Sequence, residues 1–394
     1  MSIRIGYAQS IITPALVRPV FLAGFGQNRR AVDVHDDLFA RVLVVCSDSE
    51  TLVLCALDLI GFFRKDVLEI TERIHLQTPG AQLILASTHT HHGPDSMGLW
   101  GPDDKTSGVD ALYMHELKEI VIATILDALS SLNPASLLTA SIHVPGVAKN
   151  ARNPAIVDDE LTIAQFIDPH GKALASLFNF PCHPEVLWEH NPHISADYPG
   201  VLRREVERAS AAPCIFFAGA LGGMMTPDVK EHSFDEAELI GKKLAEEGLK
   251  AIESKALRAQ PDQISIRKAE INLKLTNVLY KLAFWRKLLP DTRNKRGELI
   301  SEVNLLKIGP LWLATVPGEM LPELGMALKN SLISAGAGVA GVIGLANDEL
   351  GYILPKEDFK YPLNPFRPGK HYEETNAIGK EIGPRVIEAL LSLL

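Results

Sequence analysis

The chain has few cysteines for its length. The four are Cys46, Cys55, Cys182 and Cys214 in 394 residues, and most of them lie inside apolar runs. Scattered cysteines of this kind are typical of reduced core thiols and not of a disulfide framework. The sequence contains no CxxC pair, which argues against a zinc site built from thiolates.

Long apolar stretches and basic clusters are also missing. No segment has 18 consecutive apolar residues, so we expect no transmembrane span. Residues 1–7 lack the apolar stretch of a signal peptide, which makes the cytoplasm the default location. The formal net charge is -9, and the sequence has no Lys/Arg cluster of the kind that binds the phosphate backbone of a nucleic acid. We therefore expect a small-molecule partner and no nucleic acid. The oligomeric state is not defined by the sequence.

What the chain does have is a regular alternation of short apolar runs with helical patterns. The predicted strands, bounded by polar or turn residues, are 39–46, 51–57, 82–86, 161–167, 173–180, 214–218, 311–316 and 339–345. The predicted helices are 65–76, 111–132, 198–210, 237–254, 321–334 and 376–394. This order predicts an α/β fold in which a mixed sheet is flanked by helices.

No repeat, low-complexity tract or convincing linker divides the chain. We therefore expect a single compact domain over residues 1–394, with 260–275 as the place where two lobes would meet. Alternating apolar residues in that range indicate a half-exposed strand. The polar stretch 291–298 reads as an exposed loop. Residues 355–370 hold four prolines and read as an ordered irregular loop.

The strongest local signal is the run STHTHHGPD over residues 87–95, directly after the predicted strand 82–86. Three histidines within four positions are rare by chance. Along an extended chain His89 and His91 point to one side, and histidine is the commonest metal ligand and a proton carrier near neutral pH. A polar turn of hydrogen-bonded histidines is the alternative, which we disfavour for a cluster. The zinc patterns HExxH and HxHxDH are both absent.

Two more candidates follow predicted strands: His183 in NFPCHPE (179–185) and Glu319 in TVPGE (315–319). Alone, His183 reads as a structural histidine and Glu319 as a carboxylate at a helix N-terminus. Together with His89, both come two to three residues beyond a predicted strand, where sites of open α/β sheets are assembled. Two histidines and one carboxylate with an open position form a catalytic zinc shell, and such an ion lowers the pKa of bound water.

A glycine-rich run, GALGGMMTPD over 219–228, follows the strand 214–218. Its glycines permit either the close approach of backbone to a ligand, with N–H groups for an oxyanion, or a tight strand-to-loop turn. The residues alone leave these alternatives open.

Several motifs, in order, carry a resemblance to a known family. The run THTHHGP (88–94) is similar to THTHSGP, HDDLFAR (35–41) to HDxLYAR, and TVPGE (315–319) to the same motif. Residues 5–14, 345–352 and 371–373 resemble the family's start, its LAN…Y segment and its RYE. In this way the chain resembles the neutral/alkaline (non-lysosomal) ceramidases over most of its length.

The resemblance implies an amide hydrolase with one zinc ion. It implies these metal ligands: His89, His183, Glu319 and Tyr352. It implies His91 as the acid/base partner and Tyr372 as a residue that binds the scissile amide or its oxyanion. Through the segment KNARNP (149–154) it also places Arg152 in the site.

The chain departs from the family pattern in three places. The family's GDVSPN appears as GMMTPD (223–228), so that Met224 replaces the aspartate and Thr226 the catalytic serine. Thr226 keeps a hydroxyl that can donate or carry a proton. A signal peptide and a C-terminal immunoglobulin-like domain are not seen, and the loop before Tyr372 is longer and rich in proline.

We therefore expect a zinc-dependent hydrolase of an N-acyl amide that works through metal-activated water. The alternatives are a zinc hydrolase of another acyl substrate (an ester, a lactone or a small N-acyl amine), a non-catalytic zinc-binding homologue, and a metal-free enzyme with Thr226 as nucleophile. Met97, Leu99 and Trp100 follow the histidine motif. They either line an acyl pocket or fix the loop to the core.

Overall fold

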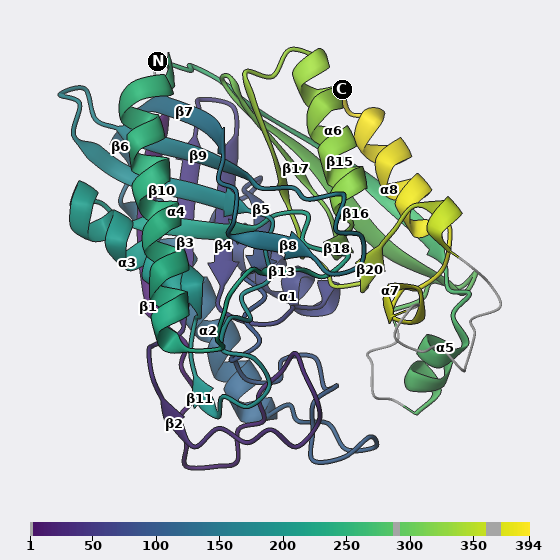
Figure 1. Cartoon of the computed structure of the whole chain (residues 1–394). Coiled ribbons are helices and arrows are strands. Elements are labelled where there is room, and N and C mark those ends of the chain that lie inside the picture. Colours follow the sequence, from purple (N-terminus) through teal and green to yellow (C-terminus); the bar gives the residue numbers. More distant parts are fainter. Residues whose placement is uncertain (1–2, 287–291, 360–371) are drawn as a thin grey trace.

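Three β-sheets form the body of the protein in the computed structural model, which describes residues 3–286, 292–359 and 372–394 (Figure 1). The first sheet has the strand order β5-β4-β3-β1-β6. Its strands are β1 (Arg4–Ile11), β3 (Phe39–Cys46), β4 (Thr51–Leu57), β5 (Gln82–Ser87) and β6 (Asn133–Pro134). All pairs are antiparallel except β4 with β5. The helices α1 (Arg64–His75) and α2 (Ala111–Ser130) pack on one face of it.

The second sheet has the order β12-β10-β9-β7-β14. Its strands are β7 (Ser136–His143), β9 (Glu160–Ile167), β10 (Ala173–Phe180), β12 (Cys214–Ala218) and β14 (Leu257–Ala259). One face is covered by the helices α3 (Tyr198–Ser210) and α4 (Phe234–Lys255), whose buried residues share a cluster with those of the sheet.

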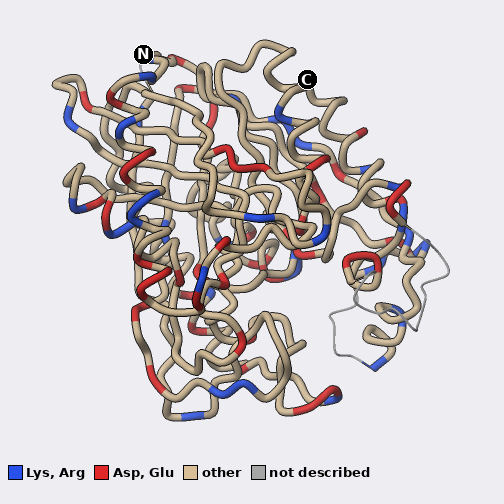
Figure 2. Tube along the Cα trace, viewed as in Figure 1, with Lys and Arg blue, Asp and Glu red and all other residues tan. Residues whose placement is uncertain are grey.

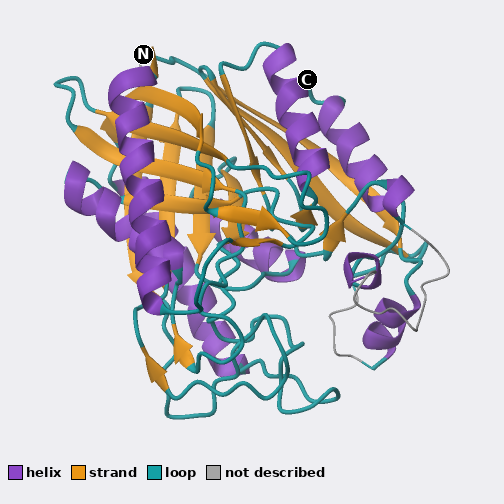
Figure 3. Cartoon of the chain, viewed as in Figure 1, coloured by secondary structure: helices purple, strands orange, loops and turns teal. Residues whose placement is uncertain are grey.

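The third sheet has the order β15-β16-β17-β19. Its strands are β15 (Ile264–Lys274), β16 (Glu298–Ile308), β17 (Leu311–Thr315) and β19 (Val339–Ile343). The helices α6 (Pro322–Ser334) and α8 (Ile382–Leu391) pack on one of its faces. Helices therefore lie outside and strands inside, as Figure 3 shows by colour.

One central core joins the three sheets. Leu54 of the first sheet, Phe166 of the second and Leu313 of the third belong to a single cluster of fully buried side chains. The strands read as nearly continuous apolar runs because helices bury one face and this core buries the other. The α/β fold expected from the sequence is confirmed.

The strand ends carry smaller pieces of structure. Three two-stranded pairs lie there: β2 (Asp33–Val34) with β11 (His193–Ile194), β8 (Ala148–Asn150) with β13 (Met225–Pro227), and β18 (Glu319–Met320) with β20 (Tyr352–Ile353). The short helices are α5 (Val278–Trp285), η1 (Lys356–Asp358) and α7 (Tyr372–Thr375).

Most predicted elements match the structure to within a few residues, and β3, β4, β10, β12 and α3 lie within or match their predicted ranges. Three long strands, β1, β7 and β16, are missing from the sequence expectation. The range 260–275 contains β15, which pairs along its whole length with β16. Residues 292–297 form the expected loop, and 360–370 of the proline-rich stretch lie outside the described residues.

Charged residues of both signs are scattered over the chain trace (Figure 2). Within the described residues, no helix combines the length and the apolar character that crossing a membrane requires.

A buried ion pair ties the first sheet to α3. Asp58, directly after β4, is fully buried, and its two oxygens lie 2.8 and 2.7 Å from the guanidinium nitrogens of Arg203. The same carboxylate accepts from the backbone N–H of Phe39 at 2.9 Å and from the hydroxyl of Thr88 at 3.2 Å. Because Thr88 precedes His89, this pair also anchors the histidine segment.

We expect Asp58→Ala to lower the free energy of unfolding by about 3–5 kcal/mol, because it leaves the buried Arg203 cation without compensation. Denaturant unfolding followed by circular dichroism measures this. Glu119→Ala is the matched control, since its pair with Arg73 is solvent-exposed and should leave the unfolding midpoint unchanged. Equal stability of the Asp58 variant and the wild type would contradict the assignment.

Candidate functional site

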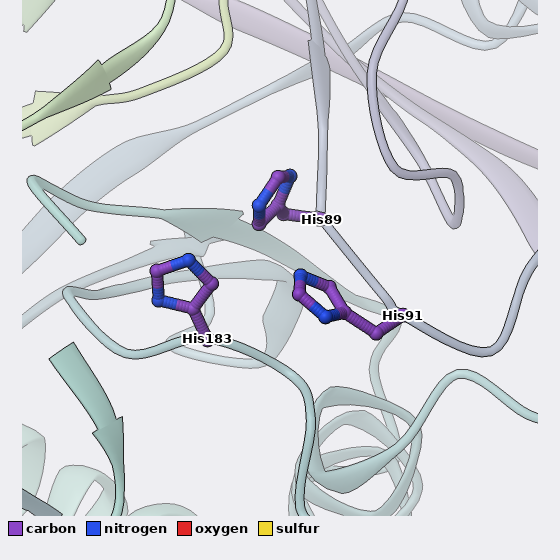
Figure 4. Close-up of side chains that lie close together, drawn as sticks. All are labelled: His89, His91 and His183. Carbon is purple, nitrogen blue, oxygen red and sulfur yellow. The ribbon is translucent and has the colours of Figure 1, made fainter. Parts of the chain in front are cut away.

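Three histidines from two segments point toward one another (Figure 4). His89 and His91 follow β5, and His183 follows β10. All three are buried, and one ring nitrogen from each lies within 4.8 Å of the others. The ring centroids are 5.0 Å apart for His89 with His91 and for His89 with His183. The predicted convergence of two strand ends is therefore present.

The segment reaches the site by a turn and not as an extended chain. His89 has φ = 70°, in the left-handed region that residues other than glycine rarely adopt. The expectation that His89 and His91 share a side through strand alternation is therefore wrong in its reason, although the two side chains do meet. A residue held in such a conformation is typical of functional sites, where the surrounding structure imposes it.

Backbone carbonyls orient two of the imidazoles. Nδ1 of His89 lies 2.6 Å from the carbonyl oxygen of Ile60, and Nδ1 of His183 lies 3.0 Å from that of Met225. A carbonyl can only accept, so each Nδ1 donates its proton to the carbonyl, and Nε2 is the nitrogen that faces Glu319. This arrangement is the usual support of histidines that bind metals.

Glu319 completes a donor set with these two nitrogens. Its Oε2 lies 3.1 Å from Nε2 of His183 and 3.8 Å from Nε2 of His89. Glu319 and Tyr352 are register partners in the parallel pair β18–β20. The Tyr352 hydroxyl lies beside the Glu319 carboxylate and 3.6 Å from Sδ of Met224. Backbone pairing thus brings together two residues that are far apart in sequence.

Burial and charge set the protonation of this group. Burial acts to lower the pKa of His183, but its hydrogen bond to Glu319 and the nearby carboxylates raise it to about 9. Burial acts to raise the pKa of Glu319, but His89 and His183 hold it below its usual value. Burial lowers the pKa of His89 to about 4. Two imidazole nitrogens, a carboxylate and a phenol oxygen in one buried place suit a divalent transition-metal ion.

Three members of the donor set, His89, Glu319 and Tyr352, lie in the wall of a cavity of about 250 Å³, and His183 lies outside its lining. Its apolar lining residues are Ile60, Phe63, Met97, Leu99, Trp100, Leu279 and Ala283. Its polar side chains are His89, His91, Tyr280, Glu319, Glu349, Tyr352, Tyr372, Thr375 and Asn376. A larger, open groove of about 910 Å³ between β15 and α8 contains none of the candidate site residues.

The loop after the histidine motif both lines the cavity and packs against the core. Met97, Leu99 and Trp100 line the cavity, and Met97 also packs on Ala23 and Ile60 in a small core cluster. Leu279, Tyr280 and Ala283 of α5 also line the cavity, and the sequence analysis did not predict this helix. Seven of its eight residues are apolar, yet none is buried. The sequence therefore lacks the alternation of apolar and polar faces by which a packed helix is predicted.

His91 lies beside the metal-ligand candidates and lines the same cavity. Burial and the neighbouring histidines hold its pKa well below the usual value. Its Nδ1 lies 3.2 Å from Oε2 of Glu185, a fully buried carboxylate that the sequence expectation does not include. The signal was present, because Glu185 stands two positions after His183 in the quoted run NFPCHPE.

The other predicted site residues lie at different distances from the cavity. Tyr372 begins α7, lines the cavity and is half exposed, with its ring centroid 5.8 Å from that of Tyr352. Thr226 lies in β13, buried beside Glu185 and behind the cavity wall. The catalytic roles of both stay predictions.

Arg152 also lies outside the cavity wall. Its guanidinium is 2.6 Å from Glu373 and 3.2 Å from Glu374. These two residues directly follow Tyr372 in α7, so Arg152 fastens the helix that carries Tyr372. A direct catalytic role for Arg152 stays a prediction.

Glu349 is a second buried carboxylate that the sequence expectation lacks. Its Oε1 accepts from the backbone N–H of Gly351 at 3.0 Å, and its Oε2 has no hydrogen-bond partner among the described residues. Burial, and then the charge of Glu319, raise its pKa well above the usual range.

The fold and the motifs together define a ceramidase-like architecture. No protein-family model matches the sequence. The neutral ceramidase of Pseudomonas aeruginosa is 22% identical over 269 residues, which are 60% of this chain and 40% of that protein. The chain thus spans about two fifths of the length of this curated relative. The resemblance predicted from the motifs is confirmed.

Solved structures agree over the full chain. The crystal structure of neutral ceramidase from Pseudomonas aeruginosa matches with a TM-score of 0.80 at 19% identity, over 100% of this chain and 74% of that one. A ceramidase complexed with C2 matches with a TM-score of 0.80 at 17% identity, over 100% and 75%. The chain therefore has the fold of these ceramidases.

Gly222 is required by a close approach of two backbones. Its N–H donates to the carbonyl oxygen of Met320 at 2.8 Å, and a Cβ at this position would lie 2.4 Å from the carbonyl oxygen of Glu319. The glycine run thus serves packing against β18.

We expect Gly222→Ala to displace Glu319 and weaken divalent-cation binding by about tenfold or more, measured by competition with a chelating dye. Gly26→Ala is the control, because its Cβ would meet nothing within 4 Å; equal affinities of the two variants would contradict this.

Cation binding should depend on pH through His183. A histidine must be neutral to ligate a metal, and the pKa of His183 without a cation is about 9. Below that pH a proton must leave, so the apparent affinity should rise about tenfold per pH unit as the pH increases toward 9. Titrations at pH 6.5, 7.5 and 8.5 check this, and a pH-independent affinity would show that His183 is not a ligand.

Proposed function

We propose that the chain is a zinc-dependent hydrolase that cleaves an amide (N-acyl) bond, as a ceramidase does. One observation carries the proposal. His89, His183 and Glu319 come from three different parts of the chain, and Oε2 of Glu319 lies 3.1 Å from Nε2 of His183 and 3.8 Å from Nε2 of His89. His89 and Glu319 also line a cavity that has both apolar and polar walls. Residues converge in this way in a catalytic shell that leaves a position open for water and substrate.

A single zinc ion is the cofactor that we propose, with Tyr352 as the fourth ligand. The donor set supports zinc, because two neutral imidazoles and a carboxylate are its usual catalytic ligands. When bound, zinc would polarise an acyl carbonyl and lower the pKa of a water molecule.

The residues of the chain supply proton transfer and orientation. His91, in the cavity wall, would take a proton from the attacking water and give it to the leaving amine. The hydroxyl of Tyr372 would donate to the carbonyl oxygen on which negative charge develops. Arg152 would keep Tyr372 in place through its ion pairs with Glu373 and Glu374.

A lipid-like N-acyl compound is the substrate class that we propose. Apolar side chains in the cavity wall, such as Phe63, Met97 and Leu279, suit an alkyl or acyl chain. The fold relatives are ceramidases, and ceramide is an N-acyl lipid; one of them was solved in complex with C2.

A non-catalytic zinc-binding protein is the second candidate. Met224 stands where the related motif has an aspartate, and its sulfur lies 3.6 Å from the Tyr352 hydroxyl. Bound zinc without turnover on amides, esters or lactones would favour this candidate over the hydrolase.

The test combines metal analysis with turnover. We expect the purified protein to contain about one zinc per chain and to hydrolyse N-acyl amines of medium or long chain length, with activity lost on chelation and regained with zinc. His89→Ala should lose both the zinc and at least about 10²-fold in kcat. His170→Ala, in an exposed turn, is the matched control. Full activity of His89→Ala would end the proposal.

We also propose a cytoplasmic location. All four cysteines are buried and unpaired, as is usual in a reducing compartment. Cell fractionation with an antibody to the chain tests this.

A further inference from the structure

Glu185 and His91 are two buried groups whose polar atoms lack well-formed hydrogen bonds. The Glu185 side chain has no exposed surface and that of His91 is 7% exposed. Neither oxygen of Glu185 and neither ring nitrogen of His91 has a hydrogen-bond partner of good geometry. Yet Nδ1 of His91 lies 3.2 Å from Oε2 of Glu185.

Orphaned groups of this kind call for an explanation, because buried polar atoms in native proteins are nearly always satisfied. An ionised carboxylate without donors is among the costliest groups to bury. The donors beside Glu185 are Nδ1 of His91 and the hydroxyl of Thr226. Contacts within a catalytic site are often long or poorly aligned until the site is loaded, so a separation of 3.2 Å is within reach of a hydrogen bond.

The rest of the surroundings fixes the position of the His91 ring. A Cβ on Gly24 would lie 2.3 Å from Cγ of His91, so the glycine backbone lies directly against the imidazole. The edge of Phe25 packs on it at 4.9 Å between centroids. The backbone N–H of His91 donates to Pro184 at 3.1 Å, and its carbonyl accepts from Arg29 at 3.2 Å. The ring is thus held in place, while the choice of which nitrogen carries the proton is left to Glu185.

We infer that Glu185 is a positioning residue: it accepts a hydrogen bond from Nδ1–H of His91 and so presents Nε2 of His91 to the cavity. The Thr226 hydroxyl donates to the same carboxylate. Thr226 therefore acts on the reaction through Glu185, and not as a nucleophile. This inference rests on the proposed hydrolytic function, in which Nε2 of His91 carries the proton between water and leaving amine.

The first measurement is steady-state kinetics with Glu185→Gln, which keeps the shape of the side chain and removes its charge. We expect kcat to fall about 10- to 100-fold, with KM within about threefold of the wild type. Asp197→Asn is the matched control, because Asp197 is a buried carboxylate 3.7 Å from His92 that lies outside the cavity wall. Unchanged kcat in Glu185→Gln would overturn the inference.

A double-mutant cycle separates positioning from a merely structural role. If Glu185 works through His91, then Glu185→Gln should cost little in a protein that already carries His91→Ala. Both single variants should lose more activity on an amide than on an activated ester, whose leaving group needs no proton. Fully additive losses, or equal losses on the two substrates, would mean that Glu185 only supports the fold.

The tautomer of His91 gives a readout that is independent of activity. In metal-free protein labelled with 15N-histidine, we expect His91, assigned through His91→Gln, to carry its proton on Nδ1. Glu185→Leu, which removes the acceptor, should change this pattern and Asp197→Asn should not. A proton on Nε2 in the wild type would overturn the inference while leaving the proposed function standing. No turnover by zinc-loaded wild type would overturn both.

Discussion

Two backbone carbonyls decide what this protein can bind. The oxygens of Ile60 and Met225 accept from Nδ1 of His89 and His183, and they thereby direct both Nε2 atoms toward Glu319. Ile60 follows β4 in the first sheet, and Met225 begins β13, which pairs with β8. The donor set is therefore only as rigid as the loops at the ends of the large sheets. The common core of Leu54, Phe166 and Leu313 holds those sheets against one another.

Much of the architecture was predictable, because the strands that helices and core bury on both faces leave unbroken apolar runs in the sequence. The strands β3, β4, β10 and β12 are of this kind. The alternating residues of the range 260–275 predicted a half-exposed strand, and β15 confirms it, whereas β16 was not predicted. α5 escaped detection because its apolar residues remain accessible and have no periodic polar face.

The candidate site divides in the same way. His89, His183 and Glu319 were predictable, since each follows a strand whose end is marked by the loss of apolar character. Tyr352 was predicted as a ligand only through the family resemblance. Its nearness to Glu319 comes from the register of β18 with β20, which cannot be read from the sequence. The position of the Glu185 carboxylate beside His91 could be found only from the structure. A single Glu after His-Pro is unremarkable until the fold brings His91 against it. The ion pairs of Arg152 with Glu373 and Glu374 also became visible only in the structure.

The pairing of β18 with β20 has a consequence for biosynthesis. A ribosome makes His89 and His183 long before Glu319, and Tyr352 emerges later still. A nascent chain that has only its first two sheets offers a cation two imidazoles and no carboxylate partner from β18. The complete set of candidate donors therefore exists only after β18 and β20 have both been translated and paired.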